Sequence, residues 1–359
     1  MSAPTSTRRR TGWHSLTVAE VSRLCDDAVA VTFDVPAELA EEFRFRPGQS
    51  LTLRRVVDGV EQRRSYSICA PAGARPRIGV REVPGGLFSS WLVREARPGD
   101  RIEVAPPTGS FTPDLAAAGH HVLIAAGSGI TPVLSIAASV LADPDTRVTL
   151  LYGNRRSATV MFTDELADLK DVCPARLELA HVLSREPREA ELFSGRLDPA
   201  KLRVLLPALL RVSDVDHWWL CGPFEMVTGA TALLTELGVP VERVHRELFY
   251  VDTPPEPVRH EEPGVTGPSS AVTVVLDGRS TEVTLPRHTS VLEGAQRVRP
   301  DLPFACKGGV CGTCRARVVT GEVDLRRNYA LEKSELDAGF VLTCQSYPVS
   351  DQLTVDYDA

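Results

Sequence analysis

The chain has 359 residues with a formal net charge of −7, and 43% of its residues are hydrophobic. At roughly 100–200 residues per domain, this length indicates two or three globular domains. No segment is strongly basic, which argues against nucleic acid as a partner. No apolar run approaches the roughly 18 residues of a membrane span, and residues 1–15 lack the apolar stretch of a signal peptide. We therefore expect a cytoplasmic protein that does not enter a membrane.

Residues 1–115 consist of short segments of strand character, separated by turn pairs such as Pro47-Gly48 and Pro98-Gly99. Short strands at this spacing are typical of an antiparallel β-barrel or sandwich. The first domain is therefore predicted to be an antiparallel β-barrel. The predicted strands are 16–24, 28–35, 49–56, 63–69, 77–83 and 100–105, and one helix is predicted at 87–96.

Residues 116–250 alternate between strand and helix patterns. Asp198 is placed to cap the amino terminus of one helix, with Pro199 in its first turn. Alternation of this kind builds an α/β domain with a doubly wound parallel sheet, in which ligands bind at the carboxyl ends of the strands. The predicted strands are 121–126, 148–153, 177–183, 217–221 and 243–249, and the predicted helices are 132–141, 164–172, 199–210 and 225–237.

Residues 251–270 are rich in proline, glycine and charged residues and have no apolar period. This composition is typical of a linker, and it separates the first 250 residues from a last segment at 271–359. We predict domains at 1–115, 116–250 and 271–359, joined before the last one by a linker at 251–270.

The last segment carries four cysteines at a distinctive spacing. Four residues separate Cys306 from Cys311, two separate Cys311 from Cys314, and 29 separate Cys314 from Cys344. This is the ligand spacing of plant-type [2Fe–2S] clusters, in which four thiolates complete two tetrahedral irons. Small residues between the cysteines let the backbone wrap the cluster and direct N–H groups at its sulfurs. We predict a [2Fe–2S] ferredoxin domain with a β-grasp (α+β) fold.

Zinc and free thiols are the alternatives for these four cysteines. A zinc ribbon needs two Cys-x-x-Cys pairs, and only one such pair is present. The cysteines at 25, 69 and 173 are dispersed, and they are interpreted as ordinary buried or partly buried thiols.

Two elements of the first domain suit a cofactor with a flat ring and a diphosphate. Arg64 and Tyr66 share one face of a predicted strand, where an aromatic ring lies beside a guanidinium. A strand, a glycine-rich turn and a helix start follow at 81–89, and free N–H groups at a helix start bind phosphate oxygens. A surface arginine and a packed tyrosine are the alternative for the first element taken alone.

Together these residues resemble the flavin domain of the ferredoxin-NADP reductase family, which carries an Arg-x-Tyr-Ser motif and a glycine-rich helix start. The resemblance implies that Tyr66 stacks on the isoalloxazine, that Ser67 lies near its N5 atom, and that Arg64 meets the diphosphate. It implies FAD rather than FMN as the flavin. Further cofactor contacts are implied for Ser65, Arg81, Gly86, Phe88 and Ser89.

The α/β segment carries two further motifs. The turn at 127–132 follows a strand and opens a helix, but Pro132 replaces the last glycine of the general dinucleotide fingerprint. The same form of turn occurs in the ferredoxin-NADP reductase family, where it binds the pyrophosphate. The resemblance implies pyrophosphate contacts at Gly127, Gly129 and Thr131, nicotinamide contacts at Cys221, Gly222, Pro223 and Met226, and flavin contacts at Glu247 and Phe249.

Three of these residues are predicted to be catalytic, namely Ser67, Cys221 and Glu247. For Cys221 the alternative is an ordinary core cysteine on a buried strand. The resemblance of Cys221-Gly222-Pro223 to the nicotinamide motif of the family implies a position near the nicotinamide ring.

Charge at the strand ends bears on nucleotide specificity. Enzymes that use NAD place an acid at the end of the second strand, whereas enzymes that use NADP place an arginine there. Here Arg155 and Arg156 follow that strand, and no acid does. Ser184, Arg185 and Arg196 resemble positions that bacterial ferredoxin-NADP reductases use for the 2′-phosphate. We predict NADPH rather than NADH.

In series these sites describe a converter from two-electron to one-electron transfer. A nicotinamide gives up a hydride, a flavin can pass electrons on singly, and a [2Fe–2S] cluster carries one. From about residue 13 onward the chain resembles the reductase components of bacterial multicomponent oxygenases, and among them the reductase subunits of phenylacetyl-CoA epoxidases. The stretches 64–69, 304–311, 328–332 and 355–358 carry that resemblance. It implies that oxygenase subunits forming a di-iron complex accept the electrons.

Two other functions are compatible with the same motifs. The reductase could serve another oxygenase, such as a Rieske-type steroid or aromatic-ring hydroxylase, or the chain could be a redox sensor without turnover. A direct oxygenase lacks support, because the eight histidines do not form a His and carboxylate cluster at metal-binding spacing.

Overall fold

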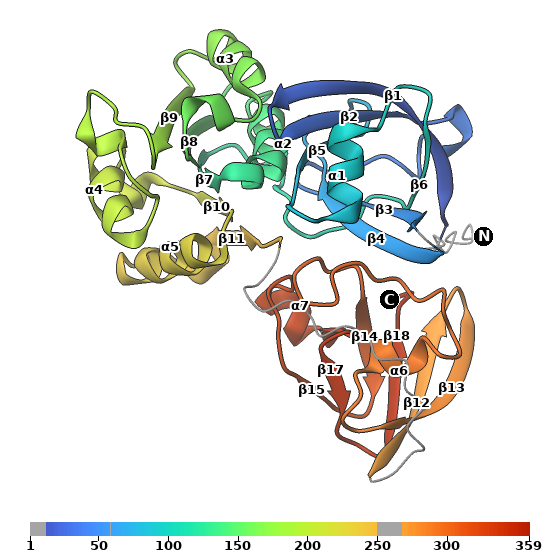
Figure 1. Ribbon diagram of the computed structural model, residues 1–359. Coiled ribbons are helices and arrows are strands. Elements are labelled where there is room, and N and C mark those ends of the chain that lie inside the picture. Colours follow the sequence, from blue (N-terminus) through green and yellow to red (C-terminus); the bar gives the residue numbers. More distant parts are fainter. Residues whose placement is uncertain (1–11, 58, 250–267) are drawn as a thin grey trace, which may run out of the picture. The chain divides into compact units, whose positions relative to one another are not determined.

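The computed structural model describes residues 12–57, 59–249 and 268–359 (Figure 1). The chain divides into two compact units, one at His14–Phe249 and one that contains residues 268–359. The predicted linker lies outside the described residues, apart from 268–270. No helix of the described part has the length and apolar character needed to cross a membrane.

An antiparallel sheet of six strands forms the first half of the larger unit, which confirms the predicted barrel. The strand order is β4-β3-β6-β1-β2-β5, and an isolated bridge between Ile68 and Ile78 brings the two edges together. Side chains such as Phe33 and Leu51 fill the interior, and Phe88 packs onto the same core. The elements are β1 (His14–Cys25), β2 (Ala28–Asp34), η1 (Ala37–Leu39), β3 (Ser50–Val57), β4 (Val60–Ser67), β5 (Arg77–Arg81), α1 (Leu87–Arg94) and β6 (Arg101–Val104).

A parallel sheet of five strands forms the second half of this unit, also as predicted. Asp198 caps α4, because its Oδ1 accepts a hydrogen bond from the Lys201 N–H at 2.8 Å. The strands are β7 (His120–Ala126), β8 (Arg147–Asn154), β9 (Leu177–Leu183), β10 (His217–Cys221) and β11 (Val244–Glu247). The helices are η2 (Gly127–Gly129), α2 (Ile130–Val140), η3 (Ser157–Thr159), α3 (Thr163–Val172), η4 (Glu191–Phe193), α4 (Pro199–Leu209), η5 (Val212–Asp214), α5 (Phe224–Glu236) and η6 (Val241–Arg243).

The order of this sheet is β11-β10-β7-β8-β9, so the chain runs outward from β7 in one direction and then returns to the other side of β7. The direction of winding reverses between β7 and β10. In doubly wound sheets the crevice at this switch point, outside the carboxyl ends of the strands, is where ligands bind. The turn after β7 and the end of β10 are therefore the places where a ligand site is expected.

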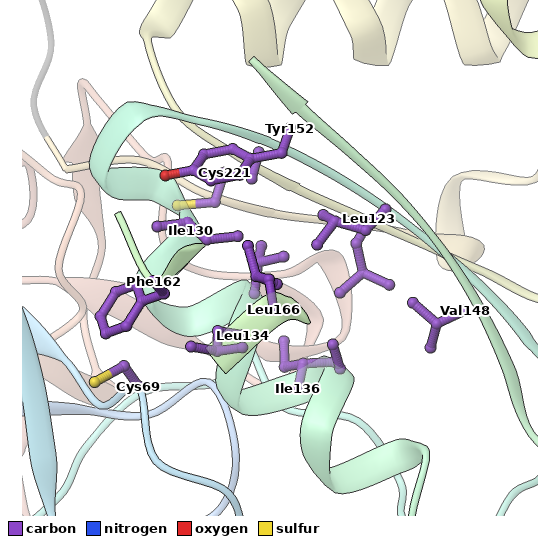
Figure 2. Close-up of a cluster of buried hydrophobic side chains, with 14 of the residues drawn as sticks. Cys69, Leu123, Ile130, Leu134, Ile136, Val148, Tyr152, Phe162, Leu166 and Cys221 are labelled. Atoms are coloured by element: carbon purple, nitrogen blue, oxygen red, sulfur yellow. The ribbon is translucent and has the colours of Figure 1, made fainter. Parts of the chain in front are cut away.

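The barrel and the parallel sheet share one hydrophobic core. Figure 2 shows Ile130 and Leu134 of α2 between Leu123 on the sheet side and Cys69 on the barrel side. All four side chains are buried, at exposed fractions of 0%, 5%, 0% and 2%. Burial of this kind stabilises the contact between the two halves, which makes 14–249 a single unit.

The two halves also make contact where the backbone of β5 in the barrel approaches α2 of the parallel-sheet half. A Cβ atom added at Gly79 would lie 2.4 Å from the Thr131 side chain and 2.8 Å from Phe162, so only glycine permits this approach. A buried hydrogen bond from Ser135 Oγ to the carbonyl oxygen of Ala70, 2.6 Å long, ties the same helix to the barrel. The amino-terminal part of α2 is therefore held in a fixed position against β5.

The second unit is an α+β fold built on a five-stranded mixed sheet. The spatial order of its strands is β13-β12-β18-β14-β16. The strands that come first and last along the chain, β12 and β18, lie side by side and run parallel. The elements are β12 (Ser269–Leu276), β13 (Arg279–Pro286), α6 (Val291–Ala295), β14 (Arg315–Thr320), β15 (Val323–Leu325), α7 (Lys333–Asp337), β16 (Phe340–Leu342), β17 (Ser346–Pro348) and β18 (Gln352–Asp356). This arrangement agrees with the predicted ferredoxin fold.

Three histidines and a tryptophan stack on one face of the parallel sheet, near the amino ends of its strands. The rings of His121 and His217 lie 5.0 Å apart, and those of Trp219 and His245 lie 4.1 Å apart. The indole N–H of Trp219 donates to Nδ1 of His121 at 3.1 Å. Burial, with a smaller contribution from His217, lowers the pKa of His121 to about 4.

This pKa predicts a loss of stability in acid. The unfolded chain binds a proton at His121 near pH 6.5 and the folded chain only near pH 4, so the unfolding free energy should fall as pH drops through this window, by up to about 1.4 kcal/mol per pH unit. His121→Gln should flatten the slope, because glutamine does not bind a proton in this range. Denaturant unfolding followed by tryptophan fluorescence measures it, and equal slopes for wild type and His121→Gln would contradict the prediction.

Candidate functional site

The turn after β7 is built around a close backbone contact. A Cβ atom added at Gly129 would lie 2.1 Å from the carbonyl oxygen of Cys221, and Gly127 has a φ of +55°, in the left-handed region. Both positions therefore require glycine, for different reasons. The turn places the free N–H groups at the start of α2 at the switch point of the sheet, where they can bind an anionic group.

The three predicted catalytic residues come together at this switch point from three strands. Ser67 ends β4 of the barrel, and its Oγ donates a hydrogen bond of 3.1 Å to Oε2 of Glu247 at the end of β11. Cys221 ends β10 and is paired with Glu247 across the parallel ladder. The site therefore spans the barrel and the sheet, and neither half could form it alone.

Burial shifts both titratable groups toward their neutral forms. It raises the pKa of Glu247 to about 8, and the hydrogen bond from Ser67 acts in the opposite direction. It also raises the pKa of the fully buried Cys221 thiol well above its usual range, and the neighbouring Glu247 adds to this effect. Near neutral pH the site thus holds a thiol and a largely protonated carboxyl group, which lie beside each other without charge repulsion.

The predicted flavin-binding residues line the barrel next to Ser67. The rings of Tyr66 and Phe88 lie 6.1 Å apart at an angle of 55°, and Phe88 is buried. Oγ of Ser89 accepts a hydrogen bond of 3.1 Å from the Val83 N–H and donates to the carbonyl of Gly86 at 3.4 Å. Ser89 therefore shapes the turn before α1, and the assignments of Gly86, Phe88 and Ser89 to the flavin stay predictions.

Arg64 and Ser65 make their own contacts on β4. The exposed Arg64 guanidinium donates to the carbonyl oxygen of the preceding residue, Arg63, at 2.7 Å, so its charge stays close to the strand. Ser65 shares a hydrogen bond of 2.9 Å with Thr52 on β3. The assignments of Arg64 and Ser65 to the flavin stay predictions.

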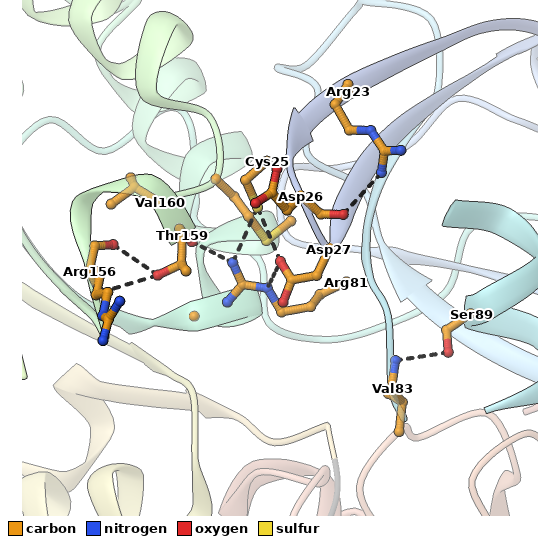
Figure 3. A network of polar contacts seen from close by, with 12 residues as sticks. Arg23, Cys25, Asp26, Asp27, Arg81, Val83, Ser89, Arg156, Thr159 and Val160 are labelled. Carbon is orange, nitrogen blue, oxygen red and sulfur yellow. Dashed lines mark hydrogen bonds and ion pairs between the residues drawn. The ribbon is translucent and has the colours of Figure 1, made fainter. Parts of the chain in front are cut away.

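Arg81 makes its contacts away from Ser89, and its assignment to the flavin phosphates stays a prediction. Figure 3 shows its guanidinium between Asp27 and Thr159, apart from Ser89. It forms an ion pair with Asp27 at 3.2 Å and donates to the carbonyl oxygen of Thr159. A Cβ atom added at Gly127 would lie 3.4 Å from the Arg81 guanidinium. Its contacts thus place Arg81 beside the turn of the parallel sheet.

The cations predicted to select NADPH gather at the ends of β8 and β9. The Ser184 N–H donates to the carbonyl of Asn154 at 2.9 Å, and the Arg185 N–H donates to that of Arg155 at 2.8 Å, so the two loops run side by side. Arg155, Arg156, Arg185 and Arg196 are all exposed. The arrangement brings three of the four arginines onto two adjacent loops, where an added phosphate could meet more than one of them.

Two residues at this edge were not predicted from the sequence. The Glu186 carboxylate accepts hydrogen bonds of 2.9 Å from both the N–H and the hydroxyl of Ser157, and these bonds lower its pKa. The Asn154 side chain is buried, and neither polar atom of its amide has a hydrogen-bond partner of good geometry among the described residues. A buried amide in this state is suited to a bound nucleotide, which would supply the missing partner. In the sequence, only their positions next to the predicted nucleotide-binding residues Arg155 and Arg185 could have indicated Asn154 and Glu186.

Gly222, Pro223 and Met226 follow Cys221 into α5, and Phe249 follows Glu247 beyond β11. The Met226 side chain packs against Gly222, where an added Cβ atom would lie 2.6 Å from its methyl group. Phe249 is partly buried against the shared core. These four residues therefore lie along the same edge of the sheet as the catalytic group.

In the second unit the cysteine loop winds through left-handed turns. Lys307, Gly309 and Gly312 have φ values of +52°, +82° and +66°. Turns of this kind point successive N–H groups to one side, which is suited to an anionic metal–sulfur group. The Gly308 N–H already donates to Sγ of Cys306 at 3.3 Å.

The three cysteines of this loop and Cys344 fall into two pairs. The largest influence on the pKa of Cys306 comes from Cys311, and the largest influence on that of Cys344 comes from Cys314. The first pair is partly exposed and the second is buried. Among the described residues no three metal-binding side chains close around a single metal ion. Two pairs of thiolates fit a binuclear cluster, in which each iron takes two protein ligands.

Comparison with known proteins defines the class of this chain. Three family profiles match it: an oxidoreductase FAD-binding domain at 15–112, an oxidoreductase NAD-binding domain at 123–232, and a 2Fe-2S iron-sulfur cluster binding domain at 274–349. A solved structure described as phthalate dioxygenase reductase, a modular structure for electron transfer from pyridine nucleotides to [2Fe–2S], has a TM-score of 0.57 and 25% identity. The similarity covers 96% of this chain and 98% of that one.

Similar curated proteins narrow the class to a family. The chain is 43% identical to one of the subunits of the 1,2-phenylacetyl-CoA epoxidase of Escherichia coli, over 97% of this chain and 99% of that protein. It is 36% identical to the ferredoxin reductase component of 3-ketosteroid-9-alpha-monooxygenase of Mycobacterium tuberculosis, over 96% and 95%. The chain is therefore an oxidoreductase, and it belongs to the family of flavin- and [2Fe–2S]-containing reductase components of oxygenases.

Proposed function

We propose that this protein transfers electrons from NADPH to the oxygenase subunits of a phenylacetyl-CoA epoxidase. The observation that carries the reductase reaction is the 3.1 Å contact between Ser67 of the barrel and Glu247 of the sheet, next to Cys221. It joins the flavin-binding and nucleotide-binding halves at the switch point. The choice of partner is supported by 43% identity to a component of such an enzyme over 97% of the chain.

The proposed division of labour follows the domains predicted at 1–115, 116–250 and 271–359, with the linker at 251–270. When bound, the FAD accepts a hydride and releases electrons singly, and the [2Fe–2S] cluster carries one electron at a time. Tyr66 offers its ring to the flavin, and Ser67, Cys221 and Glu247 surround the place where the nicotinamide would meet it. Cys306, Cys311, Cys314 and Cys344 are the proposed ligands of the cluster.

The residues beside the proposed hydride-transfer site control its charge. Cys221 stays a neutral thiol, and Glu247, with a pKa of about 8, loses its proton only in mild alkali. An ionised carboxylate there would oppose the arrival of a hydride, which carries negative charge. The protonated carboxyl, held by Ser67, is the form that favours transfer.

We expect the rate at which NADPH reduces the bound flavin to fall by about tenfold between about pH 7 and about pH 9, because Glu247 ionises in this range. Glu247→Gln cannot ionise and should keep the same rate across the range. Stopped-flow absorbance of the flavin measures the rate. Glu225→Gln, an exposed acid in the first turn of α5, is the control and should behave like wild type. The same alkaline fall in Glu247→Gln would rule out this carboxyl as the titrating group.

The proposed preference for NADPH rests on the exposed arginines at the ends of β8 and β9. A 2′-phosphate carries negative charge and several acceptor oxygens, and arginine binds such groups through paired N–H donors. Glu186 carries one negative charge, which its hydrogen bonds from Ser157 stabilise, and the exposed arginines at 155, 156, 185 and 196 outnumber it. The arginines therefore set the charge that a nucleotide meets at this edge.

Arg185→Ala should raise KM for NADPH by about tenfold or more, since a charge-assisted hydrogen bond contributes about 1.5–3 kcal/mol, and should leave KM for NADH nearly unchanged. Steady-state reduction of ferricyanide with each nucleotide gives both values. Arg211→Ala removes an exposed arginine near the opposite edge of the sheet and serves as control. An equal rise in KM for NADPH and for NADH would show that Arg185 does not bind the 2′-phosphate.

The proposed partner is tested by coupling. Consumption of NADPH should rise when the oxygenase subunits of a phenylacetyl-CoA epoxidase and phenylacetyl-CoA are added together, with formation of an oxygenated product. Cys314→Ser should still allow NADPH to bleach the flavin but should abolish coupled product formation. Oxygenase subunits of a 3-ketosteroid 9α-hydroxylase with their steroid serve as the rival acceptor. Coupling to the steroid system alone would overturn the partner and leave the reductase reaction intact.

A further inference from the structure

The stretch at 355–358 contains a tyrosine that no cofactor assignment uses. The Tyr357 side chain is completely buried, and its hydroxyl donates a hydrogen bond of 2.7 Å to Oγ1 of Thr343. A buried phenol hydroxyl needs such a partner, because an unpaired one costs free energy. Tyr357 lies just after β18, whereas Thr343 lies in the turn between β16 and β17, so the bond joins two separate segments.

Thr343 passes the contact on to the cysteine loop. Its Oγ1 donates to the carbonyl oxygen of Cys314 at 2.9 Å, and its backbone N–H donates to the same oxygen at 3.2 Å. Its own carbonyl accepts from the Leu292 N–H at 3.0 Å. Because the Thr343 proton is directed at Cys314, the lone pairs of Oγ1 face Tyr357. The direction of both hydrogen bonds is thereby determined.

These two hydrogen bonds, from Tyr357 to Thr343 and from Thr343 to Cys314, form a hydroxyl relay that ends at the buried cysteine pair, Cys314 and Cys344. Thr343 directly precedes Cys344, its hydroxyl and N–H hold the backbone of Cys314, and both cysteines are buried in the same hydrophobic core. One residue therefore connects the two segments that present this pair. The loop of the other pair, Cys306 and Cys311, is held differently, because Gln345 Nε2 donates to the carbonyl of Lys307 at 2.8 Å and the Tyr329 N–H donates to that of Gly309 at 3.0 Å.

The position of the Tyr357 ring is itself supported by its neighbours in the chain. The Tyr357 N–H donates to the carbonyl of Val275 at 2.9 Å. The Asp358 carboxylate accepts hydrogen bonds of 2.8 Å from the N–H groups of Asp277 and Gly278, at the tip of the β12–β13 hairpin. The backbone around the ring is thus fixed to this hairpin, and the ring itself is completely enclosed by the core.

We propose that Tyr357 and Thr343 are positioning residues for the buried cysteine pair, and that they set the geometry of the cluster side formed by Cys314 and Cys344. This inference rests on the proposed assignment of these cysteines as cluster ligands. The hydroxyl relay acts through the backbone of Cys314 and does not touch the sulfur atoms. Support of ligands by an outer layer of hydrogen bonds is a general determinant of metal-site stability and potential.

The two hydroxyls are not equivalent, and the difference provides the test. Thr343→Val keeps the side-chain volume but removes the bond to Cys314 and leaves the buried Tyr357 hydroxyl without its acceptor. Tyr357→Phe removes only the donor, and Thr343 keeps its bond to Cys314. In the double variant no hydroxyl is left unpaired, so the two effects should be less than additive.

The experiment uses the full chain with its flavin and cluster. Release of iron to a chelator and the electron paramagnetic resonance spectrum of the dithionite-reduced cluster are measured for each variant. We expect release about tenfold faster in Thr343→Val and about threefold faster in Tyr357→Phe, with no further acceleration in the double variant. The g values and midpoint potential should shift in Thr343→Val. Thr343→Ser keeps the hydroxyl and should restore the wild-type spectrum, which loss of packing alone would not allow.

Thr320→Val, at an exposed position on β14, is the matched control. The proposal is overturned if Thr343→Val releases iron no faster than this control, or if the spectrum is unchanged. It is also overturned if Thr343→Ser fails to restore the wild-type spectrum. If Thr343→Val does not assemble a cluster, Tyr357→Phe and Thr343→Ser decide by the same readouts. A wild-type protein that itself gave no [2Fe–2S] signal would refute the assignment of the cysteine ligands, which is a separate outcome.

Discussion

At Gly79 the barrel comes so close to α2 that an added Cβ atom would lie 2.4 Å from the Thr131 side chain. This contact, and the core shared around α2, hold an antiparallel barrel and a parallel sheet in one relative orientation. The hydrogen bond between Ser67 and Glu247 exists only in that orientation, since one residue ends a barrel strand and the other ends a sheet strand. Electron transfer between two cofactors depends on such fixed geometry, because neither cofactor can adjust its own position.

At both ends of its strands the parallel sheet holds a titratable group whose charged form is disfavoured. At the carboxyl edge burial raises the pKa of Glu247 to about 8, and at the amino edge it lowers the pKa of His121 to about 4. Both shifts arise from desolvation and favour the neutral form. Around neutral pH these buried groups therefore carry little charge, and the charged groups of the nucleotide edge, such as Arg185, stay exposed.

Local patterns were sufficient to predict most of the fold and the residue types of the site. Strand and helix periods placed the elements of the larger unit to within a few residues, and the cysteine spacing identified the ferredoxin unit. Contacts between distant segments could not be read in the same way. Arg81 lies within the predicted strand at 77–83, yet its partners Asp27 and Thr159 come from the turn between β1 and β2 and from η3. The bond between Tyr357 and Thr343 likewise depends on how β18 is inserted into its sheet.

The anchoring of Asp358 on the β12–β13 hairpin has a practical consequence for handling the protein. Tyr357 is buried, whereas Asp358 and Ala359 are exposed. A purification tag placed after Ala359 would begin at the surface and leave the anchor intact. A tag that replaced the last three residues, or a carboxypeptidase that trimmed them, would remove the side chain that fills the space behind the cysteine loop. Preparations with a ragged C-terminus are therefore expected to differ in how well they retain iron.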